Sequence, residues 1–215
     1  MKASRIATVA VLLLAAFGVA SAQGLVSRYV AGEHYRAAAE PVAQPDDGKI
    51  HVVEFFLYSC PHCDDLEPDV EAWREELPDD VEFSRVPVLF GAGGQRYARL
   101  YYAAEKLGVL EAVHSQIFSA IHDDGRRLLS QSEMRDFMED QGVDGERFVS
   151  AFESDEVSAK VRQAGEIMRG YRVTATPSFG VAGEAYVSGR TAGSNDRMFD
   201  VVDFLIRQQR SANRD

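Results

Sequence analysis

Cysteine is scarce in this sequence, since its 215 residues include only two, Cys60 and Cys63. A structural disulfide between them would close a ring of four residues and stabilise the fold by about 2 kcal/mol, against about 4.7 kcal/mol for a hundred-residue loop. A structural zinc site takes four ligands, commonly from two paired motifs, and only His62 is adjacent to this pair. We therefore expect neither a disulfide scaffold nor a bound metal, and we interpret the pair as a redox centre.

Positive charge is also scarce. Lysine and arginine number 23 against 34 acidic residues, which gives a formal net charge of −11 at pH 7. Without residues 1–22, which contain Lys2 and Arg5 and no acid, the charge becomes −13. Binding to nucleic acid requires basic groups that face the phosphates, so we expect no nucleic-acid partner. The same shortage argues against binding to anionic lipid.

Long apolar runs are limited to one, from Ile6 to Val19. It is shorter than the roughly 20 residues that span a bilayer. Basic residues precede it, and the small residues Ala20-Ser21-Ala22 follow it. This is the pattern of a secretory signal peptide, so we expect residues 1–22 to be removed by cleavage after Ala22. An uncleaved membrane anchor is the alternative. Export would place both cysteines where a disulfide can persist.

The remaining chain has no internal repeat and alternates between strand and helix signals. A nearly continuous apolar stretch at 49–58 predicts a central strand buried on both faces, and alternation at 81–89 predicts a second strand. Only helical periodicity is found at 95–169. Four further parts are predicted: an extended segment at 23–48 with an edge strand at His34–Tyr35, a flexible junction at Gly91–Gly94, a hairpin at 178–188 and a helix at 195–209.

Two features of the helical stretch allow more specific predictions. Ser130 and Glu133 have the spacing of a capping box, and Ser154 can cap a later helix that Gly170 would end. His114 and His122 are eight residues apart, which is about two turns of one helix. We expect these two histidines to serve in packing or to lie at the surface.

The C-x-x-C motif lies at the junction between the first predicted strand and a helix. Apolar residues recur at helical spacing after Cys63, so the face that carries Cys63 is predicted to point inward. Pro61 suits the first helical position, which makes Cys60 the N-cap. A thiol at a helix N-terminus is stabilised as thiolate by the dipole and by backbone N–H groups, and a protonated His62 would add to this. We therefore assign Cys60 as the attacking cysteine and Cys63 as the resolving one.

Four residues near the motif are unusual for the strand or the helix in which they are predicted to lie. Glu54 breaks the apolar strand, and a carboxylate there is costly unless neutralised or paired. It either has a functional role or faces outward at a sheet edge. Pro68 lacks an N–H and predicts a kink or break in the helix, which should end near Leu77. Asp64 and Asp65 lie near the helix N-terminus, where acids stabilise the helix but oppose a neighbouring thiolate.

The chain carries, in order, Glu54-Phe55-Phe56, Cys60-Pro61-His62-Cys63, a second strand, the helical stretch and Thr176-Pro177. This combination resembles the DsbA family of periplasmic thiol:disulfide oxidoreductases, over essentially the whole mature chain. The resemblance implies an α/β protein with a thioredoxin fold and an inserted all-helical domain. The parts would be residues 23–90 and 171–215 for the thioredoxin-like portion and 91–170 for the insertion.

The resemblance also implies roles for individual residues. A cis peptide at Thr176-Pro177 would lie against the cysteines and offer backbone groups to an extended substrate. Glu54 would lie near the resolving thiol and help to move its proton. His62 and Pro61 would complete the catalytic centre, with no cofactor other than the Cys60–Cys63 disulfide.

The implied activity is oxidation of cysteine pairs in newly exported proteins. A quinone-linked inner-membrane oxidase of the DsbB type would restore the disulfide, and we expect the chain to be a monomer in the periplasm. Two positions depart from the family pattern: Thr176 replaces a usual valine, and Asp64 a frequent aromatic residue. A disulfide isomerase or reductase of the same fold is therefore the alternative. An alternative of another class is a peptide-binding chaperone with idle cysteines, which would keep its activity after Cys60→Ser.

Overall fold

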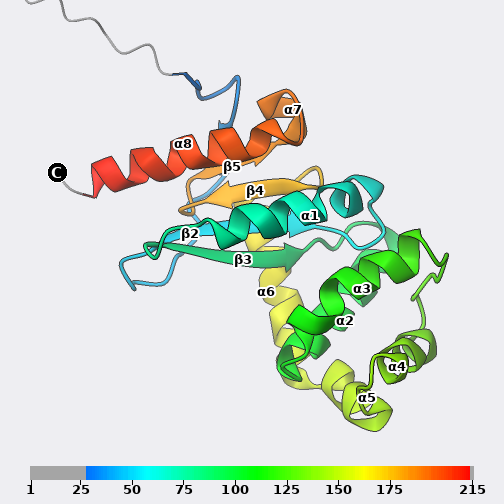
Figure 1. Cartoon of the computed structure of the whole chain (residues 1–215). Helices are drawn as coiled ribbons and strands as arrows, with labels where there is room; N and C mark the ends of the chain where they lie inside the picture. Colours follow the sequence, from blue (N-terminus) through cyan, green and yellow to red (C-terminus); the bar gives the residue numbers. More distant parts are fainter. Residues whose placement is uncertain (1–27, 214–215) are drawn as a thin grey trace, which may run out of the picture.

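The computed structural model of the protein describes residues 28–213 (Figure 1). The predicted signal peptide at 1–22 and its cleavage site after Ala22 lie outside these residues. The strands are β1 (Arg36–Ala37), β2 (Ile50–Phe56), β3 (Val81–Pro87), β4 (Ser178–Val181) and β5 (Ala185–Ser188). The helices are α1 (Pro61–Glu75), α2 (Gly91–Lys106), α3 (Leu110–His122), α4 (Gln131–Asp140), α5 (Gly145–Glu153), α6 (Asp155–Tyr171), α7 (Gly189–Ala192) and α8 (Arg197–Ala212).

These strands form one mixed sheet in the order β1-β5-β4-β2-β3. The apolar stretch predicted as a central strand is β2, and six of its seven residues are buried. It pairs in parallel with β3 and antiparallel with β4. β4 and β5 form the predicted hairpin. The end of β2 therefore leads into α1 while strands from both halves of the chain flank it.

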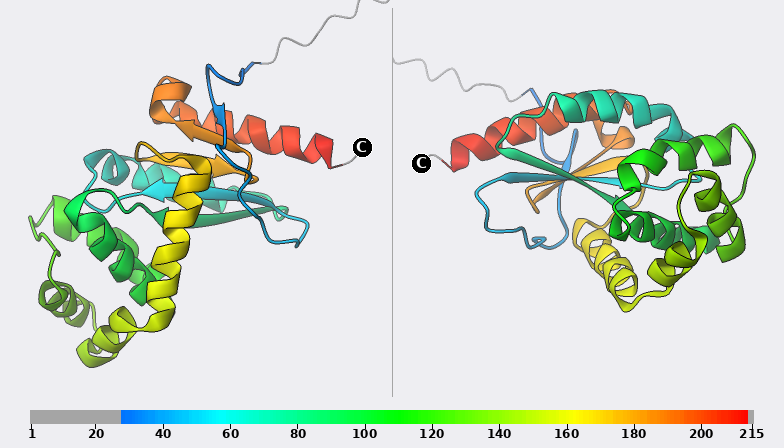
Figure 2. Two further views of the ribbon diagram at one scale, coloured as in Figure 1. Left: turned by 180° about the vertical axis from the view of Figure 1, so that it is seen from behind. Right: turned by 60° about the horizontal axis from the view of Figure 1, so that its bottom comes forward.

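Helices cover both faces of the sheet (Figures 1 and 2). On one face, α1 and α8 pack against the sheet through apolar residues such as Leu66 and Val202. On the other, the helical insertion shares a core with β2, in which the rings of Phe55 and Tyr171 lie 5.4 Å apart. The helices at 91–171 thus belong to the same core as one sheet face. We propose that residues 91–170 form an insertion into a thioredoxin-like portion, which the described residues of 23–90 and of 171–215 build.

The structure differs in part from two predictions about individual elements. The edge strand predicted at His34–Tyr35 is β1, Arg36–Ala37, which pairs antiparallel with β5. The helix after the cysteines was expected to kink or break at Pro68, and the break does not occur, because α1 is continuous through this residue. A proline removes one N–H from the helical ladder, and packing of the flanking Leu66 and Val70 in the core holds the helix together across that gap.

The prediction of a flexible junction at Gly91–Gly94 was wrong. These residues form the first turn of α2, with Phe90 as the N-cap. Glycine disfavours helix intrinsically, but Gly94 faces the chain that enters the helix. A Cβ at this position would lie 2.6 Å from the Leu89 carbonyl carbon. Close packing of two backbone segments, and not flexibility, requires this glycine.

Caps set the ends of the later helices. Ser130 and Glu133 form the predicted capping box of α4, and the Ser154 side chain accepts a hydrogen bond at the start of α6. Gly170 was expected to end α6, but the helix continues to Tyr171, and Arg172 adopts the left-handed conformation after it. None of the helices in residues 28–213 is long and apolar enough to cross a membrane.

Candidate active site

Cys60 occupies the position that the sequence predicts, the N-cap of α1 with Pro61 as the first helical residue. Its backbone is extended, with φ −93° and ψ 114°. Its carbonyl accepts the Cys63 N–H at 3.0 Å and starts the helix. Both cysteines are free, and the Cys60 side chain is half-buried. A partner thiol can therefore reach this sulfur, whereas the Cys63 side chain, three residues further along, is buried.

The environment of Cys60 lowers its pKa to about 5. The largest cause is a hydrogen bond with the Cys63 side chain, and burial opposes it. Bonds with the Thr176 side chain and with the backbone of Cys63 and His62 lower the pKa further. A thiol with this pKa is ionised at neutral pH, and the thiolate is both the reactive nucleophile and the better leaving group.

Cys63 has the opposite character. It is 1% exposed, and burial is the main cause that raises its pKa above the ordinary thiol value. The Cys60 sulfur raises the pKa further, through a hydrogen bond and through its charge. The two thiols are one helical turn apart, yet one is held ionised and the other protonated. This asymmetry is what an attacking and a resolving cysteine require.

Thr176 and Pro177 lie against Cys60 although the sequence places them far away. The Thr176-Pro177 peptide is cis, as predicted. The Cys60 thiol donates to the Thr176 carbonyl oxygen at 3.6 Å. β4 begins at Ser178 and pairs with β2 up to Phe55, so this pairing brings the two segments together at the end of the sheet.

Glu54 is buried in the central strand, so the expectation that it faces outward at a sheet edge is excluded. Its carboxylate accepts a hydrogen bond from Arg85 Nε at 2.9 Å. Burial is the first cause that raises the pKa of Glu54, and Arg85 opposes it. The charge of Glu54 in turn raises the pKa of Cys63. The carboxylate thus acts electrostatically on the resolving thiol.

Sequence reasoning missed the partners of Glu54. Arg85 and Glu67 are buried, and Arg85 Nη2 lies 3.2 Å from Glu67 Oε1. Burial raises the pKa of Glu67 to about 7. The signal for Arg85 was present: it lies directly opposite Glu54 in the parallel pairing of β2 with β3. Without that register, an arginine in an alternating strand could not be matched to a particular acid.

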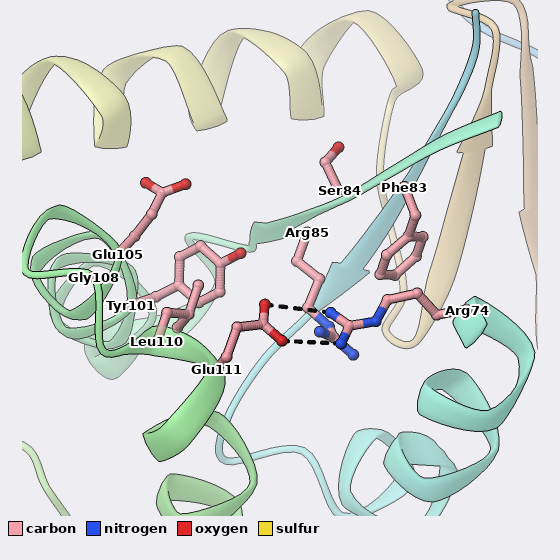
Figure 3. Close-up of a pocket in the computed structure, with 9 residues that line it drawn as sticks. All are labelled: Arg74, Phe83, Ser84, Arg85, Tyr101, Glu105, Gly108, Leu110 and Glu111. Atoms are coloured by element: carbon pink, nitrogen blue, oxygen red, sulfur yellow. Dashed lines mark hydrogen bonds and ion pairs between the residues drawn. The ribbon is translucent and has the colours of Figure 1, made fainter. Parts of the chain in front are cut away.

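The outer side of this buried cluster opens to a pocket of about 350 Å³ (Figure 3). Arg85 and Phe83 of β3 line it on one side, and helices α2 and α3 line the other. Arg74 and Glu111 form an ion pair within the pocket (Figure 3). Arg85 therefore connects the buried carboxylates to a pocket at the surface, which residues of α1, α3 and β3 help to form.

The two acids that follow the motif differ in exposure. Asp65 Oδ2 lies 3.9 Å from His62 Nδ1, and both side chains are more than 70% exposed. Asp64 is half-buried in the first turn of α1. Among residues 28–213, no group of three or more His, Cys, Asp and Glu side chains is arranged to hold a metal ion.

Comparison with known proteins gives a consistent result. The sequence profile of the DSBA-like thioredoxin domain matches residues 51–205. The thiol:disulfide interchange protein DsbA of Pseudomonas aeruginosa is 35% identical over 204 residues, which cover 94% of this chain and 97% of that protein. DsbA of Azotobacter vinelandii is 41% identical over 172 residues, which cover 80% of this chain and 79% of that protein.

The fold agrees with the sequence match. The crystal structure of Pseudomonas aeruginosa DsbA superimposes with a TM-score of 0.83 and 36% identity, over 87% of this chain and 97% of that one. On sequence and structure together, this chain belongs to the DsbA family of thioredoxin-fold thiol:disulfide oxidoreductases.

Proposed function

We propose that the oxidoreductase activity of this chain runs through Cys60 and Cys63, whose disulfide oxidises cysteine pairs in newly exported proteins. The observation that carries the proposal is the contrast between the two thiols. Cys60 is half-buried with a pKa of about 5, while Cys63 is buried with a raised pKa. Stabilising the thiolate of Cys60 stabilises the reduced protein, which makes the disulfide a strong oxidant.

The reaction starts from the Cys60–Cys63 disulfide. A substrate thiolate attacks the Cys60 sulfur, the bond between the two cysteines breaks, and its electron pair leaves on Cys63. A second thiolate of the substrate then attacks the substrate sulfur of the mixed disulfide, and Cys60 leaves as thiolate. The substrate loses two electrons and two protons. Cys63 takes up one proton and becomes a thiol, and the other proton passes to solvent because Cys60 ends as a thiolate.

Cys63 needs a proton when the internal disulfide opens, because its pKa is raised by burial. Glu54 is a buried acid whose pKa is also raised. We assign to it the exchange of that proton. His62 contributes to Cys60 through its backbone, and its imidazolium would add a positive charge at the helix N-terminus. Pro61 fixes the first turn that presents these groups.

The segment at Thr176-Pro177 is the proposed contact for the substrate backbone. It precedes β4 and lies beside the Cys60 sulfur. An extended peptide placed along it can form main-chain hydrogen bonds whatever its side chains are. Such binding suits an enzyme that must accept many exported chains.

The proposed function also implies a cellular compartment and a partner that reoxidises Cys60 and Cys63. The apolar run at Ile6–Val19 supports export, and an oxidising compartment, the periplasm, allows the disulfide to persist. Reoxidation requires an electron acceptor, and a quinone-linked inner-membrane oxidase of the DsbB type would supply it. We propose that the chain acts as a monomer with no cofactor beyond its own disulfide.

Equilibrium titration in glutathione buffers tests this function. The mature protein would be mixed with defined ratios of reduced to oxidised glutathione, and its redox state followed by alkylation. We expect half-reduction at a potential well above that of thioredoxin, about −270 mV. A potential near that value would make the chain a reductant. Unchanged activity of Cys60→Ser would contradict any redox function.

A further inference from the structure

The segment that precedes Cys60 is held by the helical insertion through two histidines of α3. His122 Nε2 donates a hydrogen bond to the backbone carbonyl of Tyr58 at 2.8 Å. His114 Nδ1 lies 2.8 Å from the Tyr58 hydroxyl. The two histidines are two turns apart on one helix face, so they hold the same residue at its backbone and at its side-chain end.

The surroundings of His114 indicate which tautomer it adopts. Its Nε2 lies 3.4 Å from Glu67 Oε1, and a neutral imidazole carries one N–H and one lone pair. Among residues 28–213 no hydrogen-bond partner reaches the buried Nε2. The charge of the nearby carboxylate still favours a proton on Nε2 over one on Nδ1, so Nδ1 accepts from the Tyr58 hydroxyl. The His114 ring is 4% exposed and packs between aromatic rings, including those of Phe56 and Phe118. Its orientation is therefore fixed.

Tyr58 is adjacent to the residue that contacts both cysteines. The carbonyl of Leu57 accepts the Cys60 N–H at 2.9 Å, and the Leu57 backbone also forms a hydrogen bond with the Cys63 sulfur. A rotation of the Tyr58–Ser59 peptide would displace this turn, the N-cap and the donors that face the Cys60 sulfur. Tyr58 is buried, at 0% exposure, and its carbonyl is bonded by His122 of α3.

We propose that His122 and His114 are positioning residues, which fix the turn at Leu57–Cys60 so that the amides of α1 face the Cys60 thiolate. The insertion then contributes to the redox properties of the cysteines and does more than bury the sheet. This inference rests on the proposed function of Cys60 and Cys63. It predicts that loss of the α3 hydrogen bonds weakens the oxidant without removing either cysteine.

The decisive variants separate the hydrogen bond from the packing. His122 stacks on Phe118 with ring centroids 6.2 Å apart, so His122→Phe keeps an aromatic ring but has no N–H to donate. His122→Gln loses the ring and keeps a side-chain N–H donor. Tyr58→Phe removes only the hydroxyl that faces His114. His51→Phe is the control, because His51 bonds Asp47 at the far end of β2.

Two readouts report on the redox centre: the Cys60 pKa from thiolate absorbance and the equilibrium constant with glutathione. We expect His122→Phe to raise the Cys60 pKa and to change the equilibrium constant about three- to tenfold toward a weaker oxidant, as loss of one ordinary hydrogen bond would. Tyr58→Phe should shift both in the same direction. His122→Gln should keep the Cys60 pKa and the equilibrium constant close to the wild-type values. His51→Phe should leave both quantities unchanged.

Unfolding of each variant in the oxidised and the reduced form distinguishes positioning from simple support. By linkage, a variant that changes the redox equilibrium must change the two stabilities by different amounts. We expect His122→Phe to destabilise the reduced form more. Equal destabilisation, with an unmoved pKa and equilibrium constant, would overturn the inference and leave the proposed function intact. Failure of the wild-type chain to exchange disulfides would instead refute the function itself.

Discussion

The Cys60 sulfur and the Thr176 carbonyl oxygen lie 3.6 Å apart although 116 positions separate the two residues. Thr176 interacts with Cys60 through both its backbone carbonyl and its side chain. The carbonyl accepts a hydrogen bond from the thiol, and the side chain stabilises the thiolate. A valine at this position would keep the first interaction and lose the second.

Thr176→Val is therefore expected to raise the Cys60 pKa and to make the disulfide a weaker oxidant. Thiolate absorbance against pH and glutathione titration measure the two effects. Thr176→Ser keeps the hydroxyl and serves as the matched control. A Cys60 pKa that is the same in Thr176→Val and the wild type would show that the hydroxyl does not face the thiolate.

Replacement of the two cysteines should have different outcomes. Cys60→Ser should abolish thiol exchange, because the accessible nucleophile is lost. Cys63→Ser should trap mixed disulfides through Cys60, because the thiol that would release the substrate is missing. Mass spectrometry after mixing with a reduced exported protein detects the adduct. Alkylation mapping that finds Cys63 the more reactive thiol would reverse the assignment.

The pKa of Cys60 predicts how the reduced protein responds to acid. Its thiolate absorbance should fall with a midpoint near pH 5, while Cys63, with its raised pKa, stays protonated. A lowered thiol pKa stabilises the folded reduced form fully above the unfolded value of about 8.5, and this stabilisation is lost as pH falls through 5. The reduced form should therefore gain stability over the oxidised form from about pH 5 to 8.5, as measured by denaturant unfolding.

Arg85→Met should destabilise the fold by about 3–5 kcal/mol, because it leaves the buried carboxylates of Glu54 and Glu67 without the arginine that pairs with both. Adding Glu54→Gln to Arg85→Met should recover part of that loss, since one buried charge is removed. Arg210→Met, which breaks the pair with Asp80 near the surface, should have a much smaller effect. Equal losses for the two arginines in urea unfolding would contradict this.

Asp64 and Asp65 should oppose the Cys60 thiolate through like charge. The exposure of Asp65 and the partial exposure of Asp64 keep the effect modest. We expect Asp64→Asn with Asp65→Asn to lower the Cys60 pKa and to raise the reduction potential together. His62→Ala should shift both the other way. Asp69→Asn, an exposed acid further along α1, is the control. A pKa unmoved or raised in the double variant would mean that the two carboxylates do not act on Cys60.

Local sequence patterns were sufficient where neighbours in the chain decide the structure. The N-cap at Cys60 and the capping box at Ser130 depend on a few consecutive residues and were predicted. The partner of Glu54 was not, because Arg85 meets it only through the register of β2 with β3. The role of Gly94 was missed for the same kind of reason. Its low helix propensity is visible in the sequence, but the approach of Leu89 is not.

The position of β2 in the sheet determines when the redox centre can form during synthesis. β2 lies between β3, which follows shortly after it, and β4, which the ribosome adds about a hundred residues later. Until that second neighbour emerges, Cys60 has its helix but lacks Thr176, and the buried side of Cys63 is open. The contact between Cys60 and Thr176 therefore completes the redox centre only when almost the whole chain is available to fold.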